Sequence, residues 1–211
     1  LFLPGSWPAY FKKTKGINIW GLDNNRYKDF ALMGVGTNIL GYSNNYVDKA
    51  VQKVVSDGNM SSFNSTEEVY LAEKLIDMHK WSEMVKLTRT GGEAASVAIR
   101  LARASTNRDT VAVCGYHGWH DWYLSTNLSN INNLNKHLLN KTPIHGVQKS
   151  LKNTSIAFDY NNFEQLEKIS KKNNLAAIIM EVSRNIEPNK NFLKKIRNLA
   201  NKKNIVLIFD E

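Results

Sequence analysis

The chain has 211 residues, 42% of them hydrophobic, and a formal net charge of +9. This length and apolar content suffice for one large core, and no apolar run is long enough to span a membrane, so we expect no membrane partner. A single cysteine, Cys114, excludes an internal disulfide and suits a reducing compartment, which predicts a cytoplasmic protein. The lysines occur in scattered pairs beside asparagines, without a basic stripe among aromatic residues, which argues against a nucleic-acid partner.

The first part of the chain is predicted to form a hairpin followed by two helices. Residues 16–30 alternate polar and apolar side chains around an Asp-Asn-Asn turn, which indicates a β-hairpin. Residues 45–57 carry valines and an alanine at helical spacing. Ser65 or Thr66 is expected to cap a second helix, which runs to about His79.

From about residue 84 the pattern changes to alternating strands and helices. Strands are predicted at residues 84–87, 111–114, 155–158, 175–180 and 205–209. Helices are predicted at residues 93–105, 135–139, 162–172 and 190–203. The last two strands are continuous apolar runs, which is typical of strands buried on both faces. The alternation predicts an α/β fold, with a mainly parallel sheet and helices on both faces.

Two glycines come directly before the helix predicted at 93–105. Glycine lets a backbone approach a ligand closely, and the first turn of a helix offers free N–H groups and the positive end of the helix dipole. Gly91 and Gly92 are therefore candidates for binding a phosphate, although a glycine pair before a helix is also consistent with a plain tight turn. The stretch matches neither the P-loop nor the dinucleotide-binding fingerprint.

Polar or aromatic residues follow three of the predicted strands, where the ligands of an α/β sheet usually bind. Tyr116 could stack on a flat ring or could simply pack. Glu181 and Asp210 each end an apolar run, and Asp210 could either cap a loop or partner a buried cation such as a protonated ring nitrogen. His117 and His120 could suggest a metal, but their spacing and the lack of a Cys/His cluster argue against one.

Seven short motifs share their order and spacing with one enzyme family. They lie at residues 21–30, 39–42, 67–73, 89–94, 98–103, 116–118 and 207–211. Together they resemble the class III aminotransferases, which are pyridoxal-phosphate (PLP) enzymes of fold type I. The resemblance is greatest to the glutamate-1-semialdehyde aminomutase-like branch, and it covers nearly the whole chain.

The resemblance implies a role for each candidate residue toward PLP. Gly91 and Gly92 would offer backbone N–H groups to the phosphate. Tyr116 would stack on the pyridine ring, with His117 beside it. Asp210 would pair with the pyridinium nitrogen and keep the ring protonated, so that the ring can accept electrons. No metal is implied.

The sequence also departs from the family pattern. Gly92 stands where the family often has threonine, so a side-chain hydroxyl contact is lost. Glu181 matches the Glu of a Glu-Pro motif, but Val182 replaces the proline. Arg184 or Asn185 would lie near the ring hydroxyl of the cofactor.

The resemblance further implies how the chain is organised and what it does. Residues 1–56 would be an N-terminal segment that contributes to a small domain, and residues 57–211 the first part of an incomplete PLP-binding large domain. The Schiff-base lysine of the family falls beyond Glu211, so no catalytic residue is assigned and this portion is expected to be inactive alone.

The expected function is transfer of an amino group from a small-molecule donor to a carbonyl acceptor by a homodimer. An intramolecular aminomutase and a non-catalytic fold-type-I binding protein remain alternatives. A mutase needs no external amino donor, so a test of donor dependence would separate the first two.

Overall fold

The computed structural model describes residues 8–31, 33–137, 140, 142–183 and 186–211. The chain divides into two compact units, residues 1–84 and 85–211. Residues 57–84, which the sequence analysis joined to the large domain, belong to the first unit, and the domain boundary proposed from the sequence stays a prediction. Within the described ranges no helix is long and apolar enough to cross a membrane.

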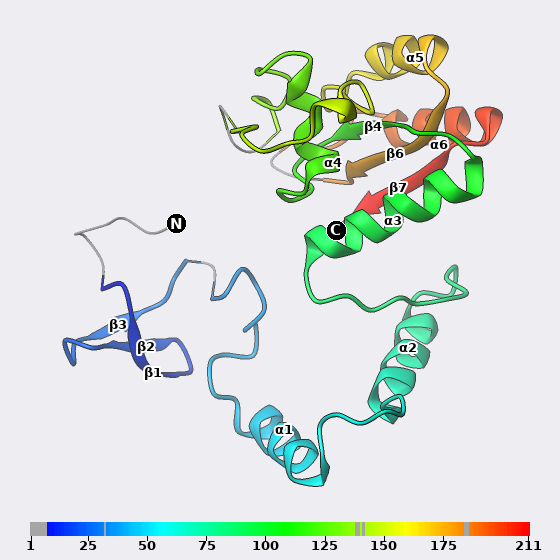
Figure 1. The fold of residues 1–211 in the computed structure, drawn as a ribbon. Helices are drawn as coiled ribbons and strands as arrows, with labels where there is room; N and C mark the ends of the chain where they lie inside the picture. The colour runs from blue at the N-terminus through cyan, green and yellow to red at the C-terminus, as the bar shows by residue number, and fades with distance from the viewer. Residues whose placement is uncertain (1–7, 32, 138–139, 141, 184–185) are drawn as a thin grey trace. The chain divides into compact units, whose positions relative to one another are not determined.

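The first unit contains a small antiparallel sheet and two helices (Figure 1). The sheet has the order β1-β2-β3 and is formed by Phe11–Lys15, Asn18–Gly21 and Arg26–Lys28. The β2–β3 pair is the predicted hairpin, whereas β1 was not predicted. Helices α1 (Asn45–Asp57) and α2 (Thr66–Met78) confirm both helix predictions.

Side-chain caps determine where these two helices begin. The Asn44 side chain accepts hydrogen bonds from the N–H groups of Tyr46 and Val47 at the start of α1. Ser65 Oγ accepts from the Glu67 N–H at the start of α2, so Ser65 is the cap of the two candidates. Each cap satisfies N–H groups that have no partner within the helix.

The second unit is built on a four-stranded parallel sheet with the order β5-β4-β6-β7 (Figure 1). The strands are β4 (Thr110–Cys114), β5 (Ser155–Ala157), β6 (Leu175–Glu181) and β7 (Val206–Asp210). These four strands were predicted at nearly the same positions. The prediction of a strand at 84–87 was wrong, because in the described chain this segment pairs with no other strand.

Helices cover both faces of this sheet, as predicted. Helix α3 (Gly91–Thr106) packs on one face, and α5 (Phe163–Lys172) and α6 (Phe192–Lys203) pack on the other (Figure 1). Successive residues of β6 alternate between the two cores: Ile178 faces α5 and α6, and Ile179 faces α3. Strand β6 is thus buried on both faces.

Strand β7 differs from the prediction of a fully buried strand. Val206, Leu207 and Ile208 are only half-buried, and Phe209 is 44% exposed. The reason is that β7 lies at one edge of the described sheet, so only β6 covers its side. Its register with β6 places Asp210 next to Glu181.

The long connection after β4 contains short elements that the sequence analysis missed. They are α4 (Asp121–Leu124) and the 3-10 turns η1 (Ser125–Leu128) and η2 (Lys149–Leu151). The helix predicted at 135–139 was wrong for residues 135–137, which form turns, while 138 and 139 lie outside the described residues. Asparagine-rich sequence favours such turns because asparagine side chains bond to nearby backbone.

A single arginine joins the beginning of β6 to the end of α6. Arg108 Nη1 lies 3.0 Å from the carbonyl oxygens of Leu175 and Lys203 and 3.1 Å from that of Asn204. Asn204 is the left-handed C-cap of α6, where carbonyl groups have no partner within the helix. Arg108 therefore satisfies carbonyl groups that the helix leaves open.

Replacing Arg108 by alanine is expected to lower the free energy of unfolding by about 1–3 kcal/mol, because hydrogen bonds to a charged group are lost and carbonyls are left without partners. Urea-induced unfolding of the whole protein measures this change. Arg100→Ala is the control, since Arg100 is exposed on α3 and its side chain makes no hydrogen bond or ion pair to the described residues. Equal losses in both variants would contradict a capping role for Arg108.

Candidate functional site

The first turn of α3 presents two free N–H groups. Thr90 is the N-cap, and its Oγ1 accepts from the Glu93 N–H at 3.1 Å. Glu93 Oε2 in turn accepts from the Arg89 N–H at 2.9 Å. The N–H groups of Gly91 and Gly92 have no hydrogen-bond partner among the described residues. The α3 terminus is thus capped and still has two donors for an anion.

One interpretation of the sequence was that the two glycines form a tight turn before the helix, but the structure shows no such turn. Both lie inside α3, and neither has a positive φ. At Gly92 the reason for glycine is space: a Cβ there would lie 2.9 Å from His120 Nε2. At Gly118, which has φ +94°, a Cβ would lie 3.2 Å from the Gly92 Cα. The loop after β4 therefore rests directly on the first turn of α3.

The ends of β6 and β7 bring two predicted carboxylates together. Glu181 and Asp210 are neighbours in the parallel register. Glu181 Oε2 lies 3.4 Å from the Tyr116 backbone nitrogen, which follows β4. The Tyr116 ring makes an edge contact with Tyr123, at 5.9 Å between centroids. The structure thus places Tyr116, Glu181 and Asp210 together at the carboxyl ends of the parallel strands, as the sequence predicted.

His117 is buried behind Asp210. Its Nδ1 lies 2.7 Å from Asp210 Oδ2, and its Nε2 lies 3.1 Å from the Cys114 carbonyl oxygen. The His117 side chain is fully buried, whereas that of Asp210 is 39% exposed. A carbonyl oxygen only accepts hydrogen bonds, so Nε2 is the donor to Cys114. When Nδ1 also carries a proton, the ring is a cation that holds one carboxylate oxygen and leaves Asp210 Oδ1 for another partner.

Three side chains that no sequence pattern indicated support this loop. Ser96 Oγ lies 2.8 Å from His120 Nδ1 and accepts from Trp122 Nε1 at 3.1 Å. Tyr123 Oη donates to the Gly115 carbonyl oxygen at 2.8 Å. The unusual glycine at position 92 was the one signal that something fills the space beside it. No group of three possible metal ligands occurs in the described ranges, and Arg184 and Asn185 lie outside them.

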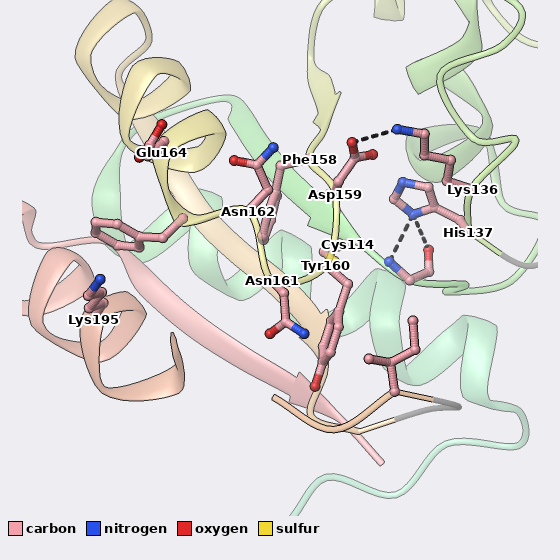
Figure 2. Close-up of a pocket in the computed structure, with 13 residues that line it drawn as sticks. Cys114, Lys136, His137, Phe158, Asp159, Tyr160, Asn161, Asn162, Glu164 and Lys195 are labelled. Atoms are coloured by element: carbon pink, nitrogen blue, oxygen red, sulfur yellow. Dashed lines mark hydrogen bonds and ion pairs between the residues drawn. The ribbon is translucent and has the colours of Figure 1, made fainter. Parts of the chain in front are cut away.

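A separate hollow of about 690 Å³ lies beside the ends of β4 and β5 (Figure 2). Lys136 and Asp159, which line the hollow, form an ion pair of 2.8 Å. Tyr160 also lines it, and burial raises the pKa of this tyrosine. Its wall includes Cys114 and Gly115, directly before Tyr116, but none of the six residues predicted to bind the cofactor. The hollow is therefore distinct from the candidate site.

The fold of this chain is similar to that of solved transaminases. The structure superposes on the omega-transaminase from Sphaerobacter thermophilus with a TM-score of 0.84 at 23% identity, over 97% of this chain and 49% of that one. At this identity the likeness shows the fold, the α/β fold of the PLP-transferase large domain, and nothing more. Residues 4–211 match the aminotransferase class-III family. The chain belongs to this family.

Curated relatives agree with this assignment. The glutamate-1-semialdehyde 2,1-aminomutase of Sulfolobus acidocaldarius is 35% identical over 97% of this chain and 49% of its own length. The 3-aminobutyryl-CoA aminotransferase of Cloacimonas acidaminovorans is 32% identical over all of this chain and 49% of its own. The chain thus spans about half the length of the curated relatives it matches.

Proposed function

We propose that the protein to which this chain belongs is a PLP-dependent enzyme that transfers amino groups. The observation that carries the proposal is the arrangement of three features at the carboxyl ends of the parallel strands. These are the free N–H groups of α3, the Tyr116 ring, and the carboxylate of Asp210 backed by His117. An anion, a flat ring and a cationic ring nitrogen are the three chemical features of protonated PLP, so the residues fit this cofactor.

Each residue has a defined task in this proposal. The N–H groups of Gly91 and Gly92 bind the phosphate. Tyr116 packs on the face of the pyridine ring. Asp210 Oδ1 would accept a hydrogen bond from the protonated ring nitrogen, while His117 holds Oδ2 and so fixes the direction of the carboxylate. When bound, PLP supplies an electron-accepting ring.

Glu181 completes the support of the site. Its carboxylate lies against the backbone after β4, at the Tyr116 nitrogen and beneath Gly115. It can therefore hold the loop that carries Tyr116 in place. We assign Glu181 a positioning role toward the ring, in keeping with the position of the family's Glu.

Transfer between two molecules and transfer within one molecule are both open to this family. Relatives of both kinds match, an aminotransferase and several aminomutases. We propose an aminotransferase that acts on a small-molecule amino donor and a carbonyl acceptor, with the aminomutase as the second candidate. A cytoplasmic homodimer, and a large domain that begins near residue 57, belong to the same proposal.

The test uses the whole gene product. We expect it to bind PLP with a stoichiometry of one per chain and to convert a carbonyl acceptor to an amine only when an amino donor is added. Product formed without a donor would identify the aminomutase instead. A protein that binds no PLP would refute the proposal and leave the non-catalytic alternative. Size-exclusion chromatography with light scattering tests the dimer.

A further inference from the structure

His120 is the residue outside the predicted site that is most closely tied to it. It lies in the loop on the first turn of α3, half-buried. Its Nε2 lies 2.9 Å from the position that a Cβ of Gly92 would occupy, and its Cδ2 lies 3.0 Å from the same position. Contacts this short do not occur in real proteins, so the imidazole occupies the space of a side chain at position 92.

The imidazole is held in this place from its other nitrogen. His120 Nδ1 lies 2.8 Å from Ser96 Oγ. The Ser96 hydroxyl donates to the Gly92 carbonyl oxygen at 2.8 Å and accepts from Trp122 Nε1 at 3.1 Å. Since the single hydroxyl proton goes to that carbonyl, Nδ1 is the donor to Ser96. The ring orientation is thereby fixed relative to the first turn of α3.

The opposite nitrogen is left for a ligand. His120 Nε2 has no hydrogen-bond partner among the described residues, and neither do the N–H groups of Gly91 and Gly92 beside it. With Nδ1 donating to Ser96, a proton on Nε2 gives the imidazolium ion, which suits an anion. A phosphate bound at the terminus of α3 would favour this doubly protonated form, in which His120 Nε2 and the N–H groups of Gly91 and Gly92 could all donate to it.

We propose that His120 Nε2 donates a hydrogen bond to the phosphate of PLP and takes the place of a side chain at position 92. This inference rests on the proposed function, because it assigns a further residue to the same cofactor. It makes Gly92 and His120 one functional pair: glycine provides the space, and histidine provides the donor. A hydroxyl contact missing at position 92 is then replaced from the loop.

The experiment measures the dissociation constants of PLP and of pyridoxal, which lacks the phosphate, for the cofactor-free whole protein. His120→Ala is expected to weaken PLP binding by about 10- to 100-fold, the range for a hydrogen bond to a charged group. Pyridoxal binding is expected to change less than about twofold. His120→Asn serves as a second variant in case the alanine variant does not fold, and His145→Ala, an exposed histidine of the same unit, is the control.

Position 92 provides an independent readout. Gly92→Thr alone is expected to weaken PLP binding, because its Cβ meets His120. In the double variant Gly92→Thr/His120→Ala the threonine has room, and its hydroxyl should restore most of the lost affinity. The ³¹P NMR shift of bound PLP should move in His120→Ala and return toward the wild-type value in the double variant.

The outcomes separate two kinds of failure. If wild-type protein binds PLP but His120→Ala weakens PLP and pyridoxal equally, or weakens neither, this inference is wrong and the proposed function stands. If the double variant binds PLP no better than His120→Ala, the pairing of the two positions is wrong. If wild-type protein binds no PLP, both the proposed function and this inference fall.

Discussion

Asp210→Ala is expected to lower the kcat/KM of the whole protein for its amino donor by about 10²- to 10⁴-fold. The Asp210 side chain is 39% exposed, and the proposed cofactor would cover it. Removing one partner of a charge pair shielded from water in this way costs about 3–5 kcal/mol, and each 1.36 kcal/mol is about tenfold in rate. In the proposed site Asp210 Oδ1 stabilises the protonated ring nitrogen, while Oδ2 is held by His117 at 2.7 Å. Steady-state kinetics with saturating PLP measures the loss.

The control for this prediction is Asp109→Asn. Asp109 is exposed and directly precedes β4, so it lies at the amino ends of the strands, whereas Asp210 lies at their carboxyl ends. It should retain wild-type activity. Asp210→Asn keeps the size of the side chain and removes its charge, so it should lose nearly as much activity as the alanine variant. An asparagine variant with wild-type kcat/KM would show that the charge of Asp210 is not used.

Gly115→Ala is expected to lower the free energy of unfolding by about 2–6 kcal/mol, the sum of backbone strain and overpacking. Gly115 has φ +113°, a conformation that residues with a Cβ rarely adopt. An added Cβ would also clash with Glu181 Oε2 and would lie 2.9 Å from Glu181 Cγ. Relief of this clash would move Glu181, and with it the support of Tyr116. Urea-induced unfolding gives the magnitude.

Gly146→Ala separates the two contributions. Gly146 also has a positive φ, +86°, but a Cβ there would have nothing within 4 Å. This variant should show only the backbone strain, about 1–3 kcal/mol. The difference between the two variants then reports the clash with Glu181. If both lose the same free energy, the close contact at Gly115 contributes nothing.

The sequence predicted those elements whose own residues carry a strong periodic signal. Helix α1 lies at the predicted residues because its apolar side chains recur at helical spacing. Strand β6 was predicted from its continuous apolar run. Strand β1 was missed because its Phe-Lys-Lys-Thr-Lys sequence is largely polar and four of its five residues are exposed. The strand predicted at residues 84–87 was wrong for the opposite reason: the segment is mostly apolar, but it pairs with no other strand in the described chain.

The candidate site, too, was predictable only where the sequence carries a pattern. Tyr116, Glu181 and Asp210 were predicted to lie together because the carboxyl ends of parallel strands meet at one edge. The contact of His117 with Asp210 joins residues 93 positions apart and depends on the register of the strands between them. The placement of His120 against α3 depends on a loop with no periodic pattern, so only the structure reveals it.

The crowding between the loop and α3 restricts the order in which this protein can change during evolution. With His120 present, any larger residue at position 92 meets the imidazole, and a side chain at position 118 meets the Gly92 backbone. An ancestor with a side chain at position 92 would therefore have had to lose it before gaining the histidine. Positions 92 and 120 should be exchanged between homologues as a pair, because a larger residue at position 92 is accepted only where residue 120 leaves the space open.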